Sequence, residues 1–162
     1  MKFVELFLQQ IMNDFAHIKK VLFEKCVLFV EKKEATITNM LDSAKNDLLS
    51  ETKSSAGDKH ETGRAMLQLE MEKASQQLAS VNKMKETLSK VAVNNSSKIA
   101  CLGSLIITEK ANYFLAISSG KITIENIDYY AVSTNSPIGS QLLGKKIGDS
   151  IIFNETTIIE IY

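Results

Sequence analysis

The sequence has little of what secreted, membrane-spanning or independently DNA-binding proteins usually carry. Its 162 residues include two cysteines, Cys26 and Cys101, which lie far apart within apolar runs. This usage is typical of buried thiols in a reducing cytoplasm rather than of a disulfide framework. No apolar run approaches the length that a bilayer span requires. The 19 basic residues are balanced by 19 acidic ones, whereas a free-standing DNA-binding protein usually has a marked basic excess. We therefore expect a cytoplasmic protein with no membrane partner.

Proline is nearly absent as well, and its absence from the first half of the chain favours long helices. The single proline is Pro137, and the segment before Asn94 is rich in Lys, Glu, Gln, Ala and Leu, which are good helix formers. Apolar residues there recur at steps of three and four, the spacing of a coiled-coil seam. Before the breaker Ser54–Asp58 the seam positions are Ile11, Phe15, Ile18, Leu22, Cys26 and Phe29, then Ile37, Met40 or Leu41, Ala44 and Leu48. After it they are Leu67, Met71, Ala74, Leu78, Val81, Met84 or Lys85, Leu88 and Val91.

Two amphipathic helices joined by so short a loop are expected to fold back on each other as an antiparallel coiled-coil hairpin. The methionines of these helices are expected to fill its core. We assign a helical extension to residues 1–17 and the hairpin to residues 18–93, with its tip loop near residues 54–61. A small polar linker at residues 94–98 follows.

After the linker the apolar period changes to two, which predicts strands rich in Ile, Tyr, Phe and Thr. The expected strands cover residues 99–108, 113–118, 121–125, 129–133, 151–153 and 156–162, and a short helix covers 137–143. The sequence therefore predicts an α+β protein. Its coiled-coil hairpin precedes a small antiparallel sheet domain with one short helix at residues 99–162.

The most informative motif joins that short helix to a strand. It reads Ser136-Pro137-Ile138-Gly139-Ser140-Gln141-Leu142-Leu143-Gly144-Lys145-Lys146-Ile147-Gly148-Asp149. Ser136 suits the N-cap of a helix and Pro137 its first position. The Leu142-Leu143 pair is expected to bury one side, and Gly144 to end the helix as a glycine with positive φ.

This motif resembles the C-terminal signature of the Gre transcript-cleavage factors, bacterial proteins that enter the secondary channel of RNA polymerase. The Ser-Pro, Leu-Leu-Gly-Lys-Lys and Gly-Asp elements match in order and spacing, and the resemblance extends over residues 18–162. It implies an FKBP-like domain at residues 99–162 that grips the channel rim while the coiled coil enters. RNA polymerase is then the partner, and nucleic acid is contacted only within the transcription complex. The residues expected to bind the partner are Ser136, Pro137, Leu142, Leu143, Gly144 and Lys145.

The resemblance also assigns a role to the turn Gly57-Asp58-Lys59-His60-Glu61. Gre factors carry Gly-Asp-x-x-Glu at the tip of their coiled coil, where the two acids help to hold a second Mg²⁺ and position the water that cleaves backtracked RNA. Asp58 and Glu61 match these acids. Mg²⁺ prefers oxygen ligands, and two metals together stabilise the attacking and leaving oxygens of phosphodiester hydrolysis. The chain would share this Mg²⁺ with the polymerase, bind no cofactor alone and not be an enzyme by itself.

The two acids also admit a structural interpretation. Asp58-x-x-Glu61 has the spacing of a capping box, in which Asp58 caps the second helix and Glu61 reaches back. The tip also departs from the Gre pattern, because Thr62-Gly63-Arg64-Ala65 stand where Gre factors continue with Asn and then Ala-Glu-Tyr. A channel-binding regulator that does not stimulate cleavage fits this tip as well as a cleavage factor does. A metal site held by the chain itself, from Asp58, His60 and Glu61, lacks a fourth ligand.

A function outside transcription stays open. The hairpin could be a dimerisation or scaffold element, since an unpaired apolar stripe at Phe3, Phe7, Ile11 and Phe15 would seek a partner. The expected oligomeric state is a monomer or a weak homodimer. Prolyl isomerisation has only the name of the fold in its favour, and fold does not imply function. His17 is expected at the surface, and Cys101 in a buried structural position.

Overall fold

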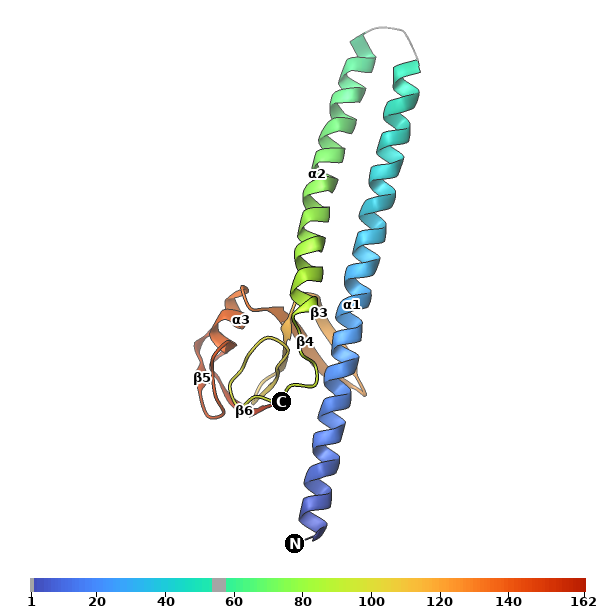
Figure 1. Ribbon diagram of the computed structural model, residues 1–162. Helices are drawn as coiled ribbons and strands as arrows, with labels where there is room; N and C mark the ends of the chain where they lie inside the picture. Colours follow the sequence, from blue (N-terminus) through green and yellow to red (C-terminus); the bar gives the residue numbers. More distant parts are fainter. Residues whose placement is uncertain (1, 54–57) are drawn as a thin grey trace. The chain divides into compact units, whose positions relative to one another are not determined.

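The computed structural model describes residues 2–53 and 58–162, and the side chains of residues 14–50 and 61–162 (Figure 1). It confirms the α+β class. The elements are α1 (Lys2–Lys53), α2 (Asp58–Ser89), β1 (Leu105–Thr108), β2 (Asn112–Ala116), β3 (Gly120–Ile124), β4 (Ile127–Ser133), α3 (Pro137–Leu142), β5 (Ser150–Ile151), a 3-10 helix η1 (Ile152–Asn154) and β6 (Thr156–Ile161).

The chain divides into two compact units. The first, here called the sheet unit, consists of Met1–Leu28 and Glu86–Tyr162; the second, the hairpin unit, is Phe29–Lys85. Helix α1 has no break between residues 17 and 18, so the expected extension is continuous with the first hairpin helix. Residues 94–98 belong to no helix or strand.

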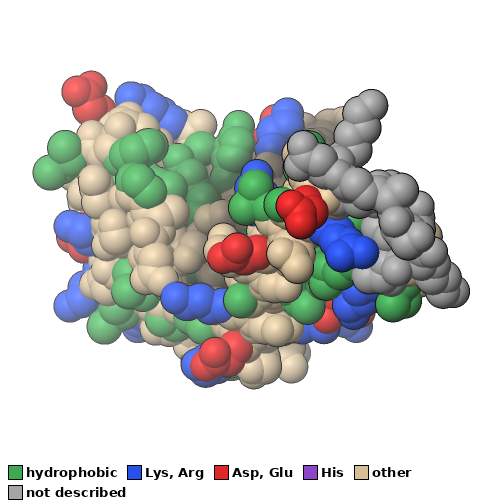
Figure 2. All heavy atoms as spheres, turned by 90° about the horizontal axis from the view of Figure 1, so that it is seen from above, with side chains coloured by type: hydrophobic (Ala, Val, Ile, Leu, Met, Phe, Trp, Pro, Cys, Tyr) green, Lys and Arg blue, Asp and Glu red, His purple; other side chains and the backbone are tan. Residues whose placement is uncertain are grey.

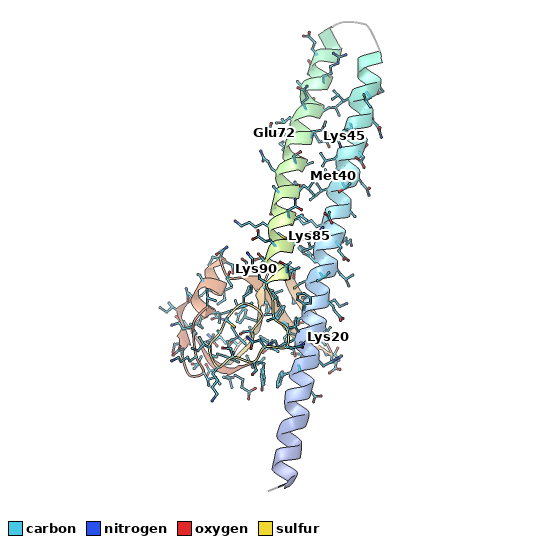
Figure 3. All side chains as sticks on the ribbon, in the orientation of Figure 1. Lys20, Met40, Lys45, Glu72, Lys85 and Lys90 are labelled. Carbon is cyan, nitrogen blue, oxygen red and sulfur yellow. The ribbon has the colours of Figure 1, made fainter. Side chains whose placement is uncertain are left out.

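In the hairpin unit, α1 and α2 lie side by side and antiparallel, as the sequence predicted (Figure 1). The residues buried along this pair are Val30, Ile37 and Ala44 of α1 and Ala74 and Val81 of α2. One ion pair joins the helices at the surface, with Lys85 Nζ 2.6 Å from Glu34 Oε2 (Figure 3). The stepped apolar pattern therefore identified the packed faces of both helices.

The predicted seam is wrong at one position of α1. Phe29 is exposed, and its neighbour Val30 is buried instead. The buried positions Leu22, Cys26 and Val30 follow one another at two successive steps of four. Such a double step departs from the heptad and moves the apolar stripe around the helix, so a strict three-four reading selects the wrong residue.

The sheet has six strands in the order β3-β4-β2-β1-β6-β5. It is mixed rather than wholly antiparallel, because β2 and β4 pair in parallel, with Phe114 opposite Ala131. The reason is the hairpin of β3 and β4, which turns at Glu125 and Asn126 with φ values of 50° and 66°. This tight turn of two left-handed residues returns β4 into the position beside β2, with β3 outside it.

Both faces of the sheet are buried. One face carries the core cluster Ala100, Ile106, Tyr113, Leu115, Ile138, Leu142, Ile151, Ile158 and Ile161, to which α3 contributes Ile138 and Leu142. On the other face Leu105, Phe114 and Ala131 lie side by side in the strand register and are equally buried. Large apolar side chains removed from water on both faces are the main source of stability for this unit.

Within the sheet unit, side chains from the first half of α1 contact residues that follow the hairpin. The ring of Phe15 stacks on the ring of Tyr162 at 3.9 Å between centroids, and Cys26 Sγ lies 3.6 Å from Ser119 Oγ. Cys26 is fully buried, as predicted, whereas Cys101 is only half-buried, which corrects the expected burial. His17 is exposed, as predicted. The side chains of Phe3, Phe7 and Ile11 lie outside the described residues.

Candidate functional site

The predicted acid pair lies at the start of α2, at the end of the hairpin unit where the two helices are joined. Helix α2 begins at Asp58, and the Glu61 side chain is exposed to solvent in its first turn. The side chains of Asp58, Lys59 and His60 lie outside the described residues. The capping role and the metal-ligand role of Asp58 therefore both stay predictions, while the Glu61 side chain is exposed to solvent.

Whether the acid pair can hold a metal ion depends on the number and kind of ligands available. Among the described residues, no group of three or more His, Cys, Asp or Glu side chains comes together in a way that could hold a metal ion. Asp58 and Glu61 offer carboxylate oxygens, which suit Mg²⁺, but two carboxylates leave most of its six positions unfilled. Two carboxylates alone would therefore need further ligands to complete a Mg²⁺ site.

The second predicted site, the motif from Ser136 to Asp149, begins with a well-formed helix cap. Ser136 Oγ accepts a hydrogen bond from the Gly139 N–H at 3.1 Å and donates one to the Ser133 carbonyl at 2.6 Å. Pro137 occupies the first turn, where no intrahelical donor is required. Gly139 is packed against the backbone, since a Cβ there would lie 2.0 Å from the Ser133 carbonyl oxygen. The cap and the glycine fix the direction in which α3 leaves the sheet.

The end of the motif is tied to two distant segments. Gly144, with φ of +79°, donates to the Ala100 carbonyl at 2.8 Å, and the Lys145 carbonyl accepts from Ala100 N–H at 2.8 Å. Gly148, with φ of +90°, donates to the Ile158 carbonyl at 2.9 Å. The positive φ at both turns favours glycine there. Much of the motif's sequence therefore serves the fold of this corner.

Of the six residues predicted to bind a partner, some are buried in the protein and others are exposed to solvent. Leu142 is fully buried in the core cluster, so it supports the segment from within and offers no surface. The hydroxyl of Ser136 is used in the cap. Pro137, Leu143 and Gly144 are exposed and Lys145 is half-buried, so these four can meet a partner.

Four exposed apolar side chains lie within or shortly after this motif, and only Leu143 was among the predicted site residues. They are Leu143, Ile147, Ile152 and Phe153, here together called the α3 patch. Ile152 is 85% exposed, which is unusual for so apolar a side chain. Gln141 Oε1 accepts the Phe153 N–H at 3.0 Å and so holds η1 against α3. The sequence signal was the Ile151-Ile152-Phe153 run, which was assigned to a strand although only Ile151 belongs to one.

The hairpin unit also exposes apolar side chains along a groove. One stretch, about 500 Å³ in volume, is lined by Phe29, Ile37 and Met40 with Lys32, Lys33, Thr36 and Gln77. A neighbouring hollow continues from Met40 and Gln77 to Met66 and Leu69. Met66 is 69% exposed and Met40 is also exposed, so the expectation that the helix methionines fill the core is wrong for these two. Flexible methionine side chains suit adaptable contact surfaces.

On the face that Figure 2 shows, acidic and basic side chains are interspersed, and neither sign gathers in one large patch. This agrees with the balance of 19 basic and 19 acidic residues. None of the described helices combines the length and the apolar character of a membrane span.

The chain was compared with protein-family models and with curated proteins. No protein-family model matches the chain, and no curated protein matches its sequence. The Gre resemblance is thus carried by the chain's own motifs.

Proposed function

We propose that this protein is a Gre-like transcription elongation factor that binds RNA polymerase at its secondary channel. The observation that carries the proposal is the joint presence of an antiparallel two-helix hairpin, with Asp58 and Glu61 at the start of its second helix, and of the Ser136–Asp149 motif in the sheet unit. Each feature alone is common. Their order along one chain is the order in Gre factors.

The hairpin supports this function because it is a paired-helix element with an acid at its accessible end. Glu61 is exposed, so the end of the hairpin can offer a carboxylate to a site on a partner without unfolding. Within the polymerase, a Mg²⁺ shared with Asp58 and Glu61 would assist hydrolysis by stabilising the charge that develops on the reacting oxygens. The two side chains supply ligands and orient water; the polymerase supplies the remaining site.

The sheet unit supports the function through its docking surface. The α3 patch offers Leu143 and Phe153 as apolar anchors, and Lys145 stands near them in the sequence as a cation. Apolar side chains with a polar surround are typical of the centre of a protein interface. We assign polymerase binding to this patch and tuning of the reaction to the hairpin end.

The test is RNA cleavage in a stalled, backtracked elongation complex made with the polymerase of the source organism. We expect the protein to shorten the RNA. We expect Asp58→Ala combined with Glu61→Ala to slow that cleavage about tenfold or more while binding is retained. The matched control combines Asp47→Ala with Glu72→Ala, two exposed acids farther from the end of the hairpin, and should behave as wild type.

Binding is tested separately with Phe153→Ser, an exposed substitution in the α3 patch that should weaken polymerase binding without unfolding the protein. Normal cleavage by the tip variant would contradict the role of the acids. Polymerase binding without cleavage, in competition with a known channel-entering factor, would identify a non-cleaving regulator. Absence of binding to polymerase would reject the proposal.

A second candidate function is assembly through the hairpin. The exposed Phe29, Met40 and Met66 along its groove favour a coiled-coil interaction module. An oligomer that forms with rising concentration and dissociates on Met40→Lys, together with no affinity for polymerase, would favour this alternative.

A further inference from the structure

One lysine of the sheet unit is buried without an ionic partner. Lys19, in the first half of α1, is 3% exposed, and its Nζ donates one hydrogen bond, of 2.8 Å, to the carbonyl of Asn95. No carboxylate among the described residues lies within ion-pair distance of it. An ammonium has three donors, so one neutral acceptor leaves most of its hydrogen-bonding capacity and all of its charge unmatched.

Such an arrangement is unfavourable unless something compensates it. Buried lysines are rare in proteins unless they are paired, and an uncompensated buried charge is costly. The neighbouring Lys20 shows the usual alternative, because it is exposed on the same helix (Figure 3). A residue that lies beside a solvent-facing lysine yet is held inside calls for a functional explanation.

Lys19 lines a pocket of about 350 Å³. The other walls are Ala16, Val93, Tyr162 and the segment Asn94–Ser96, which come from three separate parts of the sheet unit. The volume is at the lower end of the range for small-molecule sites. The Asn95 carbonyl is bonded to the ammonium, and Asn94 and Ser96 add polar groups to the lining. Ala16, Val93 and the Tyr162 ring, which stacks on Phe15, provide apolar wall.

We propose that this pocket binds a small organic carboxylate whose anionic group pairs with Lys19 and whose apolar body lies against Tyr162 and Val93. One ammonium matches one negative charge, so a monoanion balances the site. The neutral hydroxyl and amides of Asn94–Ser96 can donate to the remaining carboxylate lone pairs. A doubly charged phosphate would be left half-neutralised in the same pocket.

The electrostatics of the pocket agree with this assignment. Burial lowers the pKa of Lys19, and the nearby Cys101 opposes that shift to a smaller extent. A bound carboxylate favours the charged ammonium and so raises the pKa of Lys19 again. The binding is independent of the proposed polymerase function, since neither Asp58, Glu61 nor the α3 patch takes part.

The test uses the full chain labelled with ¹⁵N and titrated with benzoate, with benzamide as the neutral isostere. We expect benzoate to shift the amide signals of residues 93–96, and benzamide to bind about tenfold or more weakly, because charge-assisted hydrogen bonds are the stronger ones. Lys19→Met should weaken benzoate binding about tenfold or more, whereas the matched control Lys20→Met should leave it unchanged.

A second variant fills the pocket but keeps the positive charge of Lys19. Ala16→Phe, at an exposed helix position that lines the pocket, should block benzoate while leaving Lys19 in place, and serves the test if Lys19→Met fails to fold. Equal affinity for benzoate and benzamide, binding retained in both variants, shifts confined to other residues, or no shift at millimolar benzoate would each overturn the proposal.

Discussion

The two units bury their apolar side chains to very different extents. The sheet unit encloses large ones completely, among them Phe114, Leu105 and Ile106. Among the hairpin side chains that the structure describes, only Val30 and Val81 are as fully enclosed, while Phe29 and Met66 are exposed. A sheet covered on both faces can exclude water, whereas two helices alone cannot. The sheet unit therefore has the larger enclosed core, and both units leave some apolar side chains exposed to solvent.

The largest expected effect that would test this difference is a cavity in the sheet unit. Phe114→Ala removes a fully buried ring from β2, the strand between β1 and β4. We expect the free energy of unfolding to fall by about 4 kcal/mol, measured by urea denaturation followed by far-UV circular dichroism. Phe153→Ala, an exposed control, should change it by less than about 0.5 kcal/mol; equal effects of the two variants would contradict the described core.

Within the sheet unit, two glycine substitutions separate packing from backbone strain. Gly139→Ala would place its Cβ against the Ser133 carbonyl, so we expect a loss of about 3 kcal/mol in the free energy of unfolding. Gly120→Ala meets no atom within 4 Å but has φ of +88°, and strain alone should cost about 1 kcal/mol. The same urea titration measures both. A reversed order would show that the close approach at α3 is absent.

In the hairpin unit the expected effect is smaller and local. Ile37→Ala removes a buried side chain from the α1–α2 contact and should cost about 2 kcal/mol. Because the hairpin is a separate compact unit, we expect native-state hydrogen exchange to speed up in residues 29–50 and 61–85 while β1 and β2 keep their protection. Uniform acceleration across both units would show that they unfold as one.

The buried lysine predicts a dependence of stability on pH. Burial places the pKa of Lys19 below its usual 10.5 in the folded state, so the unfolded chain binds more protons between the two values. Its contribution to stability should therefore rise as pH increases through that window and be lowest below it. Lys19→Met should remove this rise and raise the free energy of unfolding near pH 7 by about 1 kcal/mol. Thermal unfolding from pH 7 to pH 10.5 measures it; an unchanged pH profile would be inconsistent with the burial.

The smallest effect concerns the ion pair on the hairpin surface. Glu34→Gln removes the charge opposite Lys85, and because both side chains are partly exposed we expect a loss of about 0.5 kcal/mol or less. The loss should disappear in 1 M salt, where the Debye length is about 3 Å. A larger effect that persists in salt would mean that the pair is shielded from water.

Periodicity located the helices and strands because each is governed by residues close together in the sequence. The expected strand 99–108 was too long, since only Leu105–Thr108 forms it, and residues 100–104 belong to no strand. The α3 cap depends on Ser136 and Gly139, and the expected helix 137–143 differs from the observed one by one residue. The parallel pairing of β2 with β4 could not be predicted this way, since it depends on where the β3–β4 hairpin lies. The exposure of Met40 and Met66 could not be predicted either. Apolar spacing identifies one face of a helix but does not show which of its residues another element buries.

The acid pair at the start of α2 and the pocket at Lys19 differ in how far apart their residues lie in the sequence. Asp58 and Glu61 are three residues apart, so a local motif was sufficient to suggest them. The pocket at Lys19 joins three segments that lie far apart in the sequence, namely the first half of α1, Asn94–Ser96 and Tyr162. No spacing rule connects such positions, and only the folded chain brings them together.

The most direct test of the account locates the hairpin end on the polymerase. An iron chelate attached at Glu61→Cys, in a protein with Cys26→Ala and Cys101→Ser, would generate hydroxyl radicals at the tip. We predict cleavage of the polymerase chain near its catalytic centre, and cleavage only outside the channel when the chelate is attached at Lys145→Cys. The same cleavage pattern from both positions, or none from the tip in a complex that forms normally, would contradict the proposed entry of the hairpin into the channel.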